Sequence, residues 1–262
     1  MNPISKHHIA KSFSQNCKDY NKSASFHQLC AEKILNHLLG LKQVPKNILE
    51  IGSHTGILSH TVSDYINDHH RDYFRLDLHK DGETYIHNKS ESQFIKGDGE
   101  QLPFLNNTFD CIISNATFQW FNNFETSLKK ILETLTQNGT LIFSQFIQPS
   151  LEPLHTWYQT IGRHEAFLNL ETIESLNQKC TKLGRYKIEK VSMDIPFENL
   201  KDMFRFLKNM GVDAPSKELP RLKRNQVSKL NVMFNESQKI DANKLNLVAA
   251  IVIIHRSEFQ EQ

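Results

Sequence analysis

The stretch NILEIGSHTG, residues 47–56, decides the fold class of this 262-residue chain. It begins as an apolar run interrupted only by Glu50, as expected for a buried strand, and Gly52 then marks a sharp turn. A helical pattern follows over residues 57–67. A parallel strand that turns through glycine into a helix opens a crevice at the carboxyl edge of its sheet, where open α/β folds bind ligands. The stretch therefore predicts a ligand-binding α/β sheet.

The rest of the chain supplies the other elements of such a sheet. Further strands are predicted at residues 73–78, 92–98, 109–115, 140–144, 186–195 and 245–255. Helical patterns occupy residues 23–39, 124–135, 151–163, 197–210 and 225–234. The alternation predicts a mostly parallel, seven-stranded, Rossmann-like α/β sheet with helices on both faces. The helices after Pro149 precede the last strand, so we expect a helical cap insertion rather than an independent domain.

Composition and cysteine usage are those of an ordinary globular protein. Hydrophobic residues make up 39% and charged residues 23% of the chain. The longest apolar run, residues 247–254, is too short to cross a bilayer, and the first residues lack an apolar signal region. The four cysteines are widely spaced and form no CxxC pair. We therefore expect no zinc site, no disulfides, no membrane contact and a cytoplasmic location.

Three acidic residues stand at three successive strand ends: Glu50, Asp77 and Asp98. A dinucleotide fingerprint instead sets a pyrophosphate on a helix N-terminus. S-adenosylmethionine (SAM) has no phosphate, but its ammonium, ribose hydroxyls and adenine amine are all groups that a carboxylate can bind. Each acid alone could be a helix cap or turn residue. Three of them in one crevice predict a SAM site.

Several longer motifs resemble one family. They are FS at 13–14, Tyr20, Ala24, Gln28, LEIG at 49–52, GDGEQLP at 97–103, SNA at 114–116, QW at 119–120, QPSL at 148–151 and LKNMG at 207–211. On these motifs the chain resembles class I SAM-dependent methyltransferases and, more narrowly, malonyl-[acyl-carrier-protein] O-methyltransferases, the BioC type of biotin synthesis. The resemblance runs nearly from end to end.

The resemblance implies a cofactor site and an acceptor. SAM contacts are implied at Glu50, Gly52, Ser53, Gly56, Asp77, Leu78, Asp98, Gly99 and Asn115, with Tyr20 and Gln28 covering the cofactor. The implied acceptor is the free carboxylate of a malonyl thioester on acyl carrier protein, and the cofactor product is S-adenosylhomocysteine. A carboxylate is already ionised at neutral pH, so the reaction requires no general base. The sequence shows no catalytic dyad and no HExxH motif, and we predict neither a catalytic residue nor a metal.

A basic segment suggests a partner surface. Residues 181–230 hold 12 Lys and Arg against 6 Asp and Glu, although the whole chain carries a net charge of only +2. Carrier proteins are acidic, so Arg185, Arg221 and Arg224 are candidate carrier contacts; the alternative is a solvated surface. Trp120 and His155 are candidate substrate contacts, although a tryptophan beside a sheet or a histidine in a helix is more often structural. We expect a monomer that binds no nucleic acid.

The chain departs from the family pattern at two places, and one of them is the family's common arginine near Gln15, which is missing. His54 stands where the family usually has glycine, inside the cofactor loop. Either its backbone stays in an allowed region with the ring turned away, or cofactor binding is weakened. Two other functions therefore stay open: a non-catalytic, methyltransferase-like binding protein with a degenerate SAM loop, and a related methyltransferase acting on another small molecule.

These expectations divide the chain into four parts. Residues 1–45 form an N-terminal helical cover and residues 46–148 the SAM-binding α/β core. Residues 149–240 form the helical cap and substrate region with one strand. Residues 241–262 supply the C-terminal strand that completes the sheet.

Overall fold

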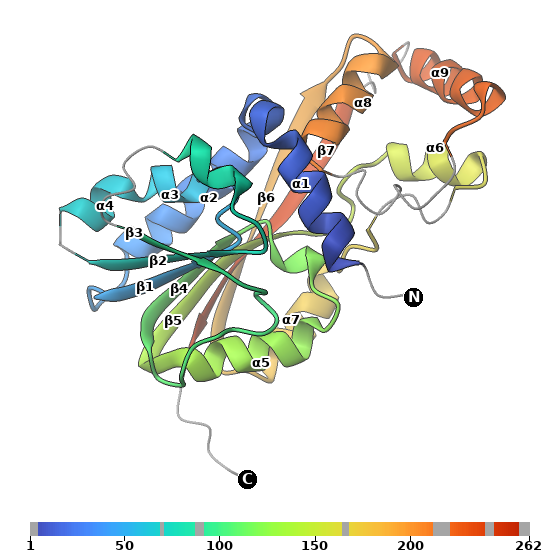
Figure 1. Cartoon of the computed structure of the whole chain (residues 1–262). Coiled ribbons are helices and arrows are strands. Elements are labelled where there is room, and N and C mark those ends of the chain that lie inside the picture. Colours follow the sequence, from blue (N-terminus) through green and yellow to red (C-terminus); the bar gives the residue numbers. More distant parts are fainter. Residues whose placement is uncertain are drawn as a thin grey trace.

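The computed structural model describes residues 5–68, 71–86, 92–163, 168–211, 221–238 and 244–256. Its centre is a seven-stranded sheet with the order β3-β2-β1-β4-β5-β7-β6 (Figure 1). Strands β1 to β6 all run in the same direction, and β7 runs antiparallel between β5 and β6. The strands are β1 (Asn47–Ile51), β2 (Asp72–Asp77), β3 (Ser92–Lys96), β4 (Phe109–Asn115), β5 (Leu135–Phe146), β6 (Arg185–Pro196) and β7 (Lys244–His255). The predicted fold class is confirmed.

The strand order reverses beside β1. From β1 the chain proceeds outward through β2 to β3, then returns to β4 on the other side of β1 and continues to β5. Ligands bind outside the carboxyl ends of the strands at such a switch point. The first loop, the end of β2 and the end of β4 all meet there.

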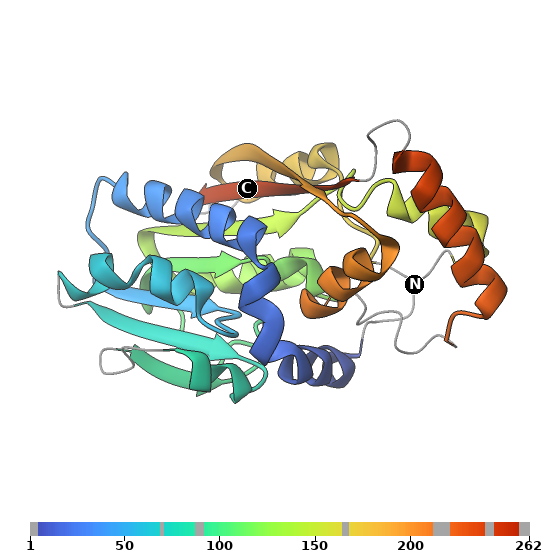
Figure 2. The same cartoon turned by 90° about the horizontal axis from the view of Figure 1, so that it is seen from above.

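Helices cover both faces of the sheet (Figures 1 and 2). On one face lie α2 (Ser25–Leu39), α3 (Ile57–Thr61) and α4 (Ser63–Asn67); on the other lie α5 (Phe124–Thr134) and α7 (Ile173–Thr181). Successive strand residues point to opposite faces. Ile48 therefore packs with Phe26 and Ile34 of α2, whereas Leu49 packs with Leu128 of α5. Burial on both faces explains why β1 reads as an almost continuous apolar run.

The remaining helices frame the carboxyl edge. Helix α1 (Lys6–Tyr20) crosses this edge, and the short helix η1 (Asn21–Ser23) leads from it into α2. Figure 2 shows α1 on one side of α8 (Leu200–Asn209), with α6 (Leu154–Thr160) and α9 (Arg224–Gln238) beyond it. The amide of Asn209 donates to the hydroxyl of Ser23 at 3.1 Å, so the cap contacts the N-terminal cover directly.

Some predicted bounds were wrong. The helix expected at 57–67 breaks at Val62, which has a φ of −95° and a ψ of 0°. Strand β5 begins at Leu135 rather than at residue 140, because its register against β4 shifts around the turn at Asn138. The helix expected at 151–163 is shorter and starts after Pro153, whose missing N–H suits a helix N-terminus. Within the described ranges, no helix has the length and apolar character to cross a membrane.

Candidate active site

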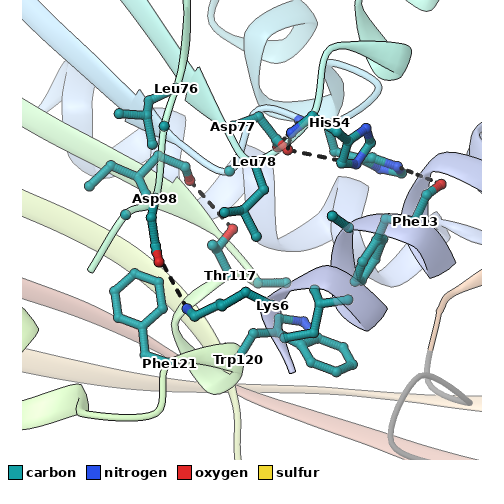
Figure 3. A pocket seen from close by; sticks show the side chains of 18 of the residues that line it. Lys6, Phe13, His54, Leu76, Asp77, Leu78, Asp98, Thr117, Trp120 and Phe121 are labelled. Atoms are coloured by element: carbon teal, nitrogen blue, oxygen red, sulfur yellow. Dashed lines mark hydrogen bonds and ion pairs between the residues drawn. The ribbon is translucent and has the colours of Figure 1, made fainter. Parts of the chain in front are cut away.

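A cleft of about 640 Å³ opens at the carboxyl edge between α1 and the ends of β1, β2 and β4 (Figure 3). This volume lies within the range of small-molecule sites. Among its lining residues are Lys6, Phe13, Tyr20, Gly52, His54, Asp77, Leu78, Asp98, Gly99, Asn115, Thr117, Trp120 and Phe121. The cleft therefore collects residues from the N-terminal helix and from four strand ends.

Gly52 makes the first turn of the cleft. Its φ is +79°, and its N–H donates to the carbonyl of Leu76 at 2.7 Å. A Cβ at this position would lie 2.0 Å from Oγ1 of Thr117. Both the backbone conformation and the close approach therefore require glycine.

Glu50, the last residue but one of β1, is a buried carboxylate. It accepts hydrogen bonds from the hydroxyls of Ser59 and Tyr73. Burial raises its pKa, and these two hydrogen bonds oppose the rise. Glu50 lines a smaller cavity of about 250 Å³ beside the cleft, together with Gly52, Ser53 and Asn115. This is called the third cavity below, after the cleft and a second cavity that adjoins it. A ligand ammonium reaching this cavity would add an ion pair to the attraction that Arg75 already exerts on this carboxylate.

Asp77 ends β2 and is held in place by backbone donors. Its carboxylate accepts from the N–H of His54 at 2.9 Å and from the N–H of His79 at 3.2 Å (Figure 3). Burial raises the pKa of Asp77, and the neighbouring His79 lowers it. Each carboxylate oxygen can accept more than one hydrogen bond, so Asp77 retains capacity for ligand hydroxyls.

Asp98 marks the opposite end of the cleft, after β3. It accepts from the N–H of Glu100 at 3.0 Å, and Nζ of Lys6 lies 3.4 Å from its Oδ1. Next to it, a Cβ on Gly99 would come within 2.7 Å of Ile51 and 2.9 Å of Phe121. The missing side chain lets Ile51 and Phe121 pack close to the backbone beside the acid.

Aromatic side chains of α1 close the cleft from above. The Phe13 ring lies edge-on to Trp120 at 5.4 Å, and the Tyr20 ring lies edge-on to His54 at 4.3 Å. Such edge-to-face pairs are favourable beyond the apolar area that they bury. The N-terminal segment is thus a packed wall of the site.

His54 takes a left-handed conformation with a φ of 42°. Its ring packs against α1, with Nε2 3.4 Å from the carbonyl of Phe13 and 3.4 Å from Sγ of Cys17. Burial lowers the pKa of His54 to about 3, so the ring is neutral at neutral pH. The backbone thus adopts a conformation that glycine would take without strain, and the ring packs against the cover.

A second cavity, of about 500 Å³, adjoins the cleft and is mostly apolar. The two share Phe13, Tyr20, Ala116 and Trp120 as a common wall. The remaining lining residues are His27, Gln119, Phe146, Leu151, Leu168, Leu170 and Met210. This arrangement suits two ligands that meet at Tyr20 and Ala116.

The structure brings most of the predicted site residues to these cavities. They are Tyr20, Glu50, Gly52, Ser53, Asp77, Leu78, Asp98, Gly99, Asn115 and Trp120. Gln28 lines none of the three cavities and donates to the hydroxyl of Thr61 at 3.2 Å instead. Gly56, with a φ of +82°, forms the turn into α3.

The predicted substrate and carrier residues are scattered. His155 lies in α6 and lines none of the three cavities, and Arg221 and Arg224 are exposed, just before α9 and at its first residue. Arg185 begins β6 and lies opposite His255 of β7, which in turn lies opposite Thr140 of β5. This is the amino edge of the sheet, opposite the cleft. The basic composition of the segment did not reveal this position, which depends on the direction of β6.

Sequence reasoning missed several wall residues, among them Lys6, His27, Thr117 and Phe121. A signal existed for His27. In the sequence, His27 stands at helical spacing from the apolar residues 31, 34 and 38, and the structure buries all four on one helix face. Gln28 is one position out of phase with this face, which explains why it points away.

The residues present fit SAM. Glu50 offers a carboxylate for the ammonium, Asp77 for the ribose hydroxyls and Asp98 for the adenine amine, at three successive points of the site. The hydroxyl of Ser53 is buried and, among the described residues, has no hydrogen-bond partner. Such a group is expected where a ligand supplies the partner.

Comparison with known proteins agrees with this geometry. Residues 49–143 match the family model described as a methyltransferase domain. Solved structures with the same fold include a putative methyltransferase from Bacillus halodurans, with a TM-score of 0.61 and 13% identity over 87% of this chain and 98% of that one. The YcgJ protein of Bacillus subtilis has a TM-score of 0.59 and 15% identity over 86% and 98%. The fold, the cleft and the family match identify the chain as a class I SAM-dependent methyltransferase.

More specific relatives carry one shared name, malonyl-[acyl-carrier protein] O-methyltransferase. The protein of that name from Priestia megaterium is 28% identical over 236 residues, covering 82% of this chain and 84% of its own length. The one from Calditerrivibrio nitroreducens is 28% identical over 209 residues, covering 76% and 80%. The similarity thus extends well beyond the α/β core.

Proposed function

We propose that this enzyme transfers the methyl group of SAM to the free carboxylate of a malonyl thioester on acyl carrier protein, as a step of biotin synthesis. The observation that carries the proposal is the extent of similarity to relatives of that name, about four fifths of both chains. Such an alignment is long enough to include parts of the chain outside the core, which is where acceptor specificity resides in a fold shared by many activities. The proposal includes a cytoplasmic, monomeric enzyme without a metal.

The chemistry asks little of the protein beyond binding and orientation. SAM, when bound, supplies a methyl group activated by its sulfonium. A carboxylate acceptor needs no base, and His27, the histidine in the wall of the second cavity, is a weak base because burial lowers its pKa to about 4. An apolar wall disfavours a carboxylate far more than its uncharged methyl ester. The cavity thus favours the product, while the aromatic residues of α1 keep water out and fix the approach.

The carrier would dock on the cap. Arg221, Lys223 and Arg224 are all exposed, in the segment that leads into α9 and at its first residue. A basic surface accelerates encounter with an acidic partner more than it tightens the final complex. Arg185 lies at the opposite edge of the sheet and offers an internal control for this surface.

The first test measures methyl ester formation with malonyl-carrier protein, malonyl-CoA and free malonate. We expect the carrier-bound acceptor to be preferred, and the gene to rescue a biotin auxotroph that lacks this step. SAM binding without methylation of any malonyl thioester would refute the malonyl proposal in favour of another small acceptor. Failure to bind SAM at high micromolar concentration in calorimetry would instead favour the degenerate binding protein.

The second test compares two charge reversals. Arg224→Glu should slow methylation of malonyl-carrier protein by about threefold to tenfold at low salt, because steering is lost. Arg185→Glu should leave it unchanged, and neither variant should affect malonyl-CoA. Equal effects of both variants would contradict docking at the cap.

A further inference from the structure

The cavities meet at one polar side chain of α2. His27 is 5% exposed and lines both the second cavity and the third cavity, the one that also contains Glu50 and Gly52. The cleft, where the cofactor-binding acids lie, shares the Tyr20 wall with both. His27 is therefore placed where an acceptor in the second cavity approaches the methionine end of the cofactor site.

His27 is also incompletely hydrogen-bonded. Its ring packs on Tyr20 at 5.5 Å and on Phe146 at 5.4 Å, both apolar contacts. Within the part of the chain that the structure describes, its Nδ1 has no hydrogen-bond partner. A buried polar nitrogen without a partner is costly, and it is expected where a ligand completes it.

A second unsatisfied group marks the same cavity. The amide nitrogen of Gln119 donates to the carbonyl of Ala116 at 2.7 Å, whereas its Oε1 is buried and, in the described ranges, lacks a partner. Gln119 lines the second cavity with His27. Two incomplete polar groups in one apolar wall indicate a ligand with a polar end as well as apolar parts.

The charge of this wall is informative. Its described lining residues include no Lys or Arg. Because burial lowers the pKa of His27 to about 4, the imidazole is neutral and carries one N–H. A cation would stabilise the acceptor carboxylate before the reaction and weaken it as a nucleophile, since the charge disappears on methylation. A neutral donor orients the carboxylate with a smaller penalty.

We propose that His27 is the acceptor-binding residue of this enzyme: its neutral imidazole donates one hydrogen bond to a carboxylate that enters the second cavity. That hydrogen bond leaves the other carboxylate oxygen directed toward the cofactor cleft. The inference rests on the carboxylate acceptor of the proposed function, and it adds the group that selects and orients this acceptor.

The test replaces His27 with Leu and with Asn, and uses Gln28→Leu as a matched control on the exposed side of the same helix. His27→Leu should lower kcat/KM for the acceptor by about 10- to 100-fold, mainly through KM, because one hydrogen bond to a charged group is lost. His27→Asn, which keeps a donor, should recover most of this loss. SAM affinity by calorimetry should stay at the wild-type level in all three variants, and the melting temperature should not fall.

Three outcomes overturn the inference. Unchanged kcat/KM in His27→Leu would show that the side chain does not bind the acceptor. Equal losses in the Leu and Asn variants, or a matching loss of SAM affinity, would show a structural role. A wild-type enzyme that methylates no carboxylate overturns the proposed function and this inference together, whereas failure of the contrast between Leu and Asn overturns the inference alone.

Discussion

The cover helix α1 is held over the cleft at its N-terminal end by one cation. Nζ of Lys6 pairs with Glu100, lies 3.4 Å from Asp98, and sits 5.0 Å from the centre of the Phe121 ring. Replacing Lys6 with Met keeps the apolar stem and removes all three interactions at once. We predict that Lys6→Met loosens α1 while the α/β core stays intact.

The size of the effect follows from the exposure of the partners. The side chains of Lys6 and Asp98 are 24% and 27% exposed, and that of Glu100 is 10% exposed. Partly exposed ion pairs contribute about 0.5 kcal/mol each, and a cation over an aromatic face about 0.5 kcal/mol more. Together these amount to about 1.5 kcal/mol, or roughly a tenfold shift from closed to open α1.

Hydrogen exchange of the α1 peptide measures this shift directly. We expect α1 amides to exchange about tenfold faster in Lys6→Met, and wild-type α1 to lose part of its protection in high salt because salt screens exposed pairs. The control is Lys11→Met, a change at an exposed position on the same helix. Equal protection in the two variants would refute the reasoning, and would mean that the aromatic packing of Phe13 and Tyr20 alone holds the helix.

Two further substitutions test the cofactor loop. Gly52→Ala should lower SAM affinity and the melting temperature, because its Cβ would lie 2.0 Å from Thr117. Gly162 has a similar φ of +75° but nothing within 4 Å of an added Cβ, so Gly162→Ala should cost only about 1 kcal/mol of backbone strain. Calorimetry and thermal melts that fail to separate these two variants would contradict the steric argument. Glu50→Gln should weaken SAM binding and leave the free energy of unfolding unchanged or higher than in the wild type. Burial raises the pKa of Glu50 above its ordinary value of 4.5 and disfavours its ionised form, so the advantage of the variant should grow as the pH rises above 4.5. A pH-independent loss of stability in this variant would show that its hydrogen bonds to Ser59 and Tyr73 outweigh its charge.

The strands and the acids at their ends were predictable because they follow from local patterns. Glu50, Asp77 and Asp98 each lie at or next to the end of a predicted strand, and the parallel topology then carries all three to the carboxyl edge. Contacts between distant segments had no such pattern. Nothing in the sequence around Lys6 indicates Asp98 as its neighbour, because that contact depends on how α1 crosses the sheet.

The same distinction explains why Arg185 and Gln28, both predicted as site residues, lie away from the cavities. Arg185 belongs to a basic segment, but its distance from the cleft follows from β6 starting at the amino edge, which only the sheet order reveals. Gln28 and His27 differ by one step, about 100° around a helix, and motif resemblance alone did not fix which of them faces inward. Burial at every helical repeat from His27 to Leu38 does fix it.

His54 shows how a departure from a family pattern can be absorbed by a different part of the structure. A left-handed backbone costs a non-glycine residue about 1 kcal/mol, and His54 has this cost at its φ of 42°. Its N–H nevertheless reaches Asp77 at 2.9 Å, so the loop holds the acid of β2 in the cleft. The imidazole packs 5.2 Å from the Phe13 ring and 4.3 Å from the Tyr20 ring, contacts that glycine would lack. The histidine therefore changes how the cover is attached and leaves the hydrogen bond of the cofactor loop to Asp77 in place, which favours a working methyltransferase over a degenerate one.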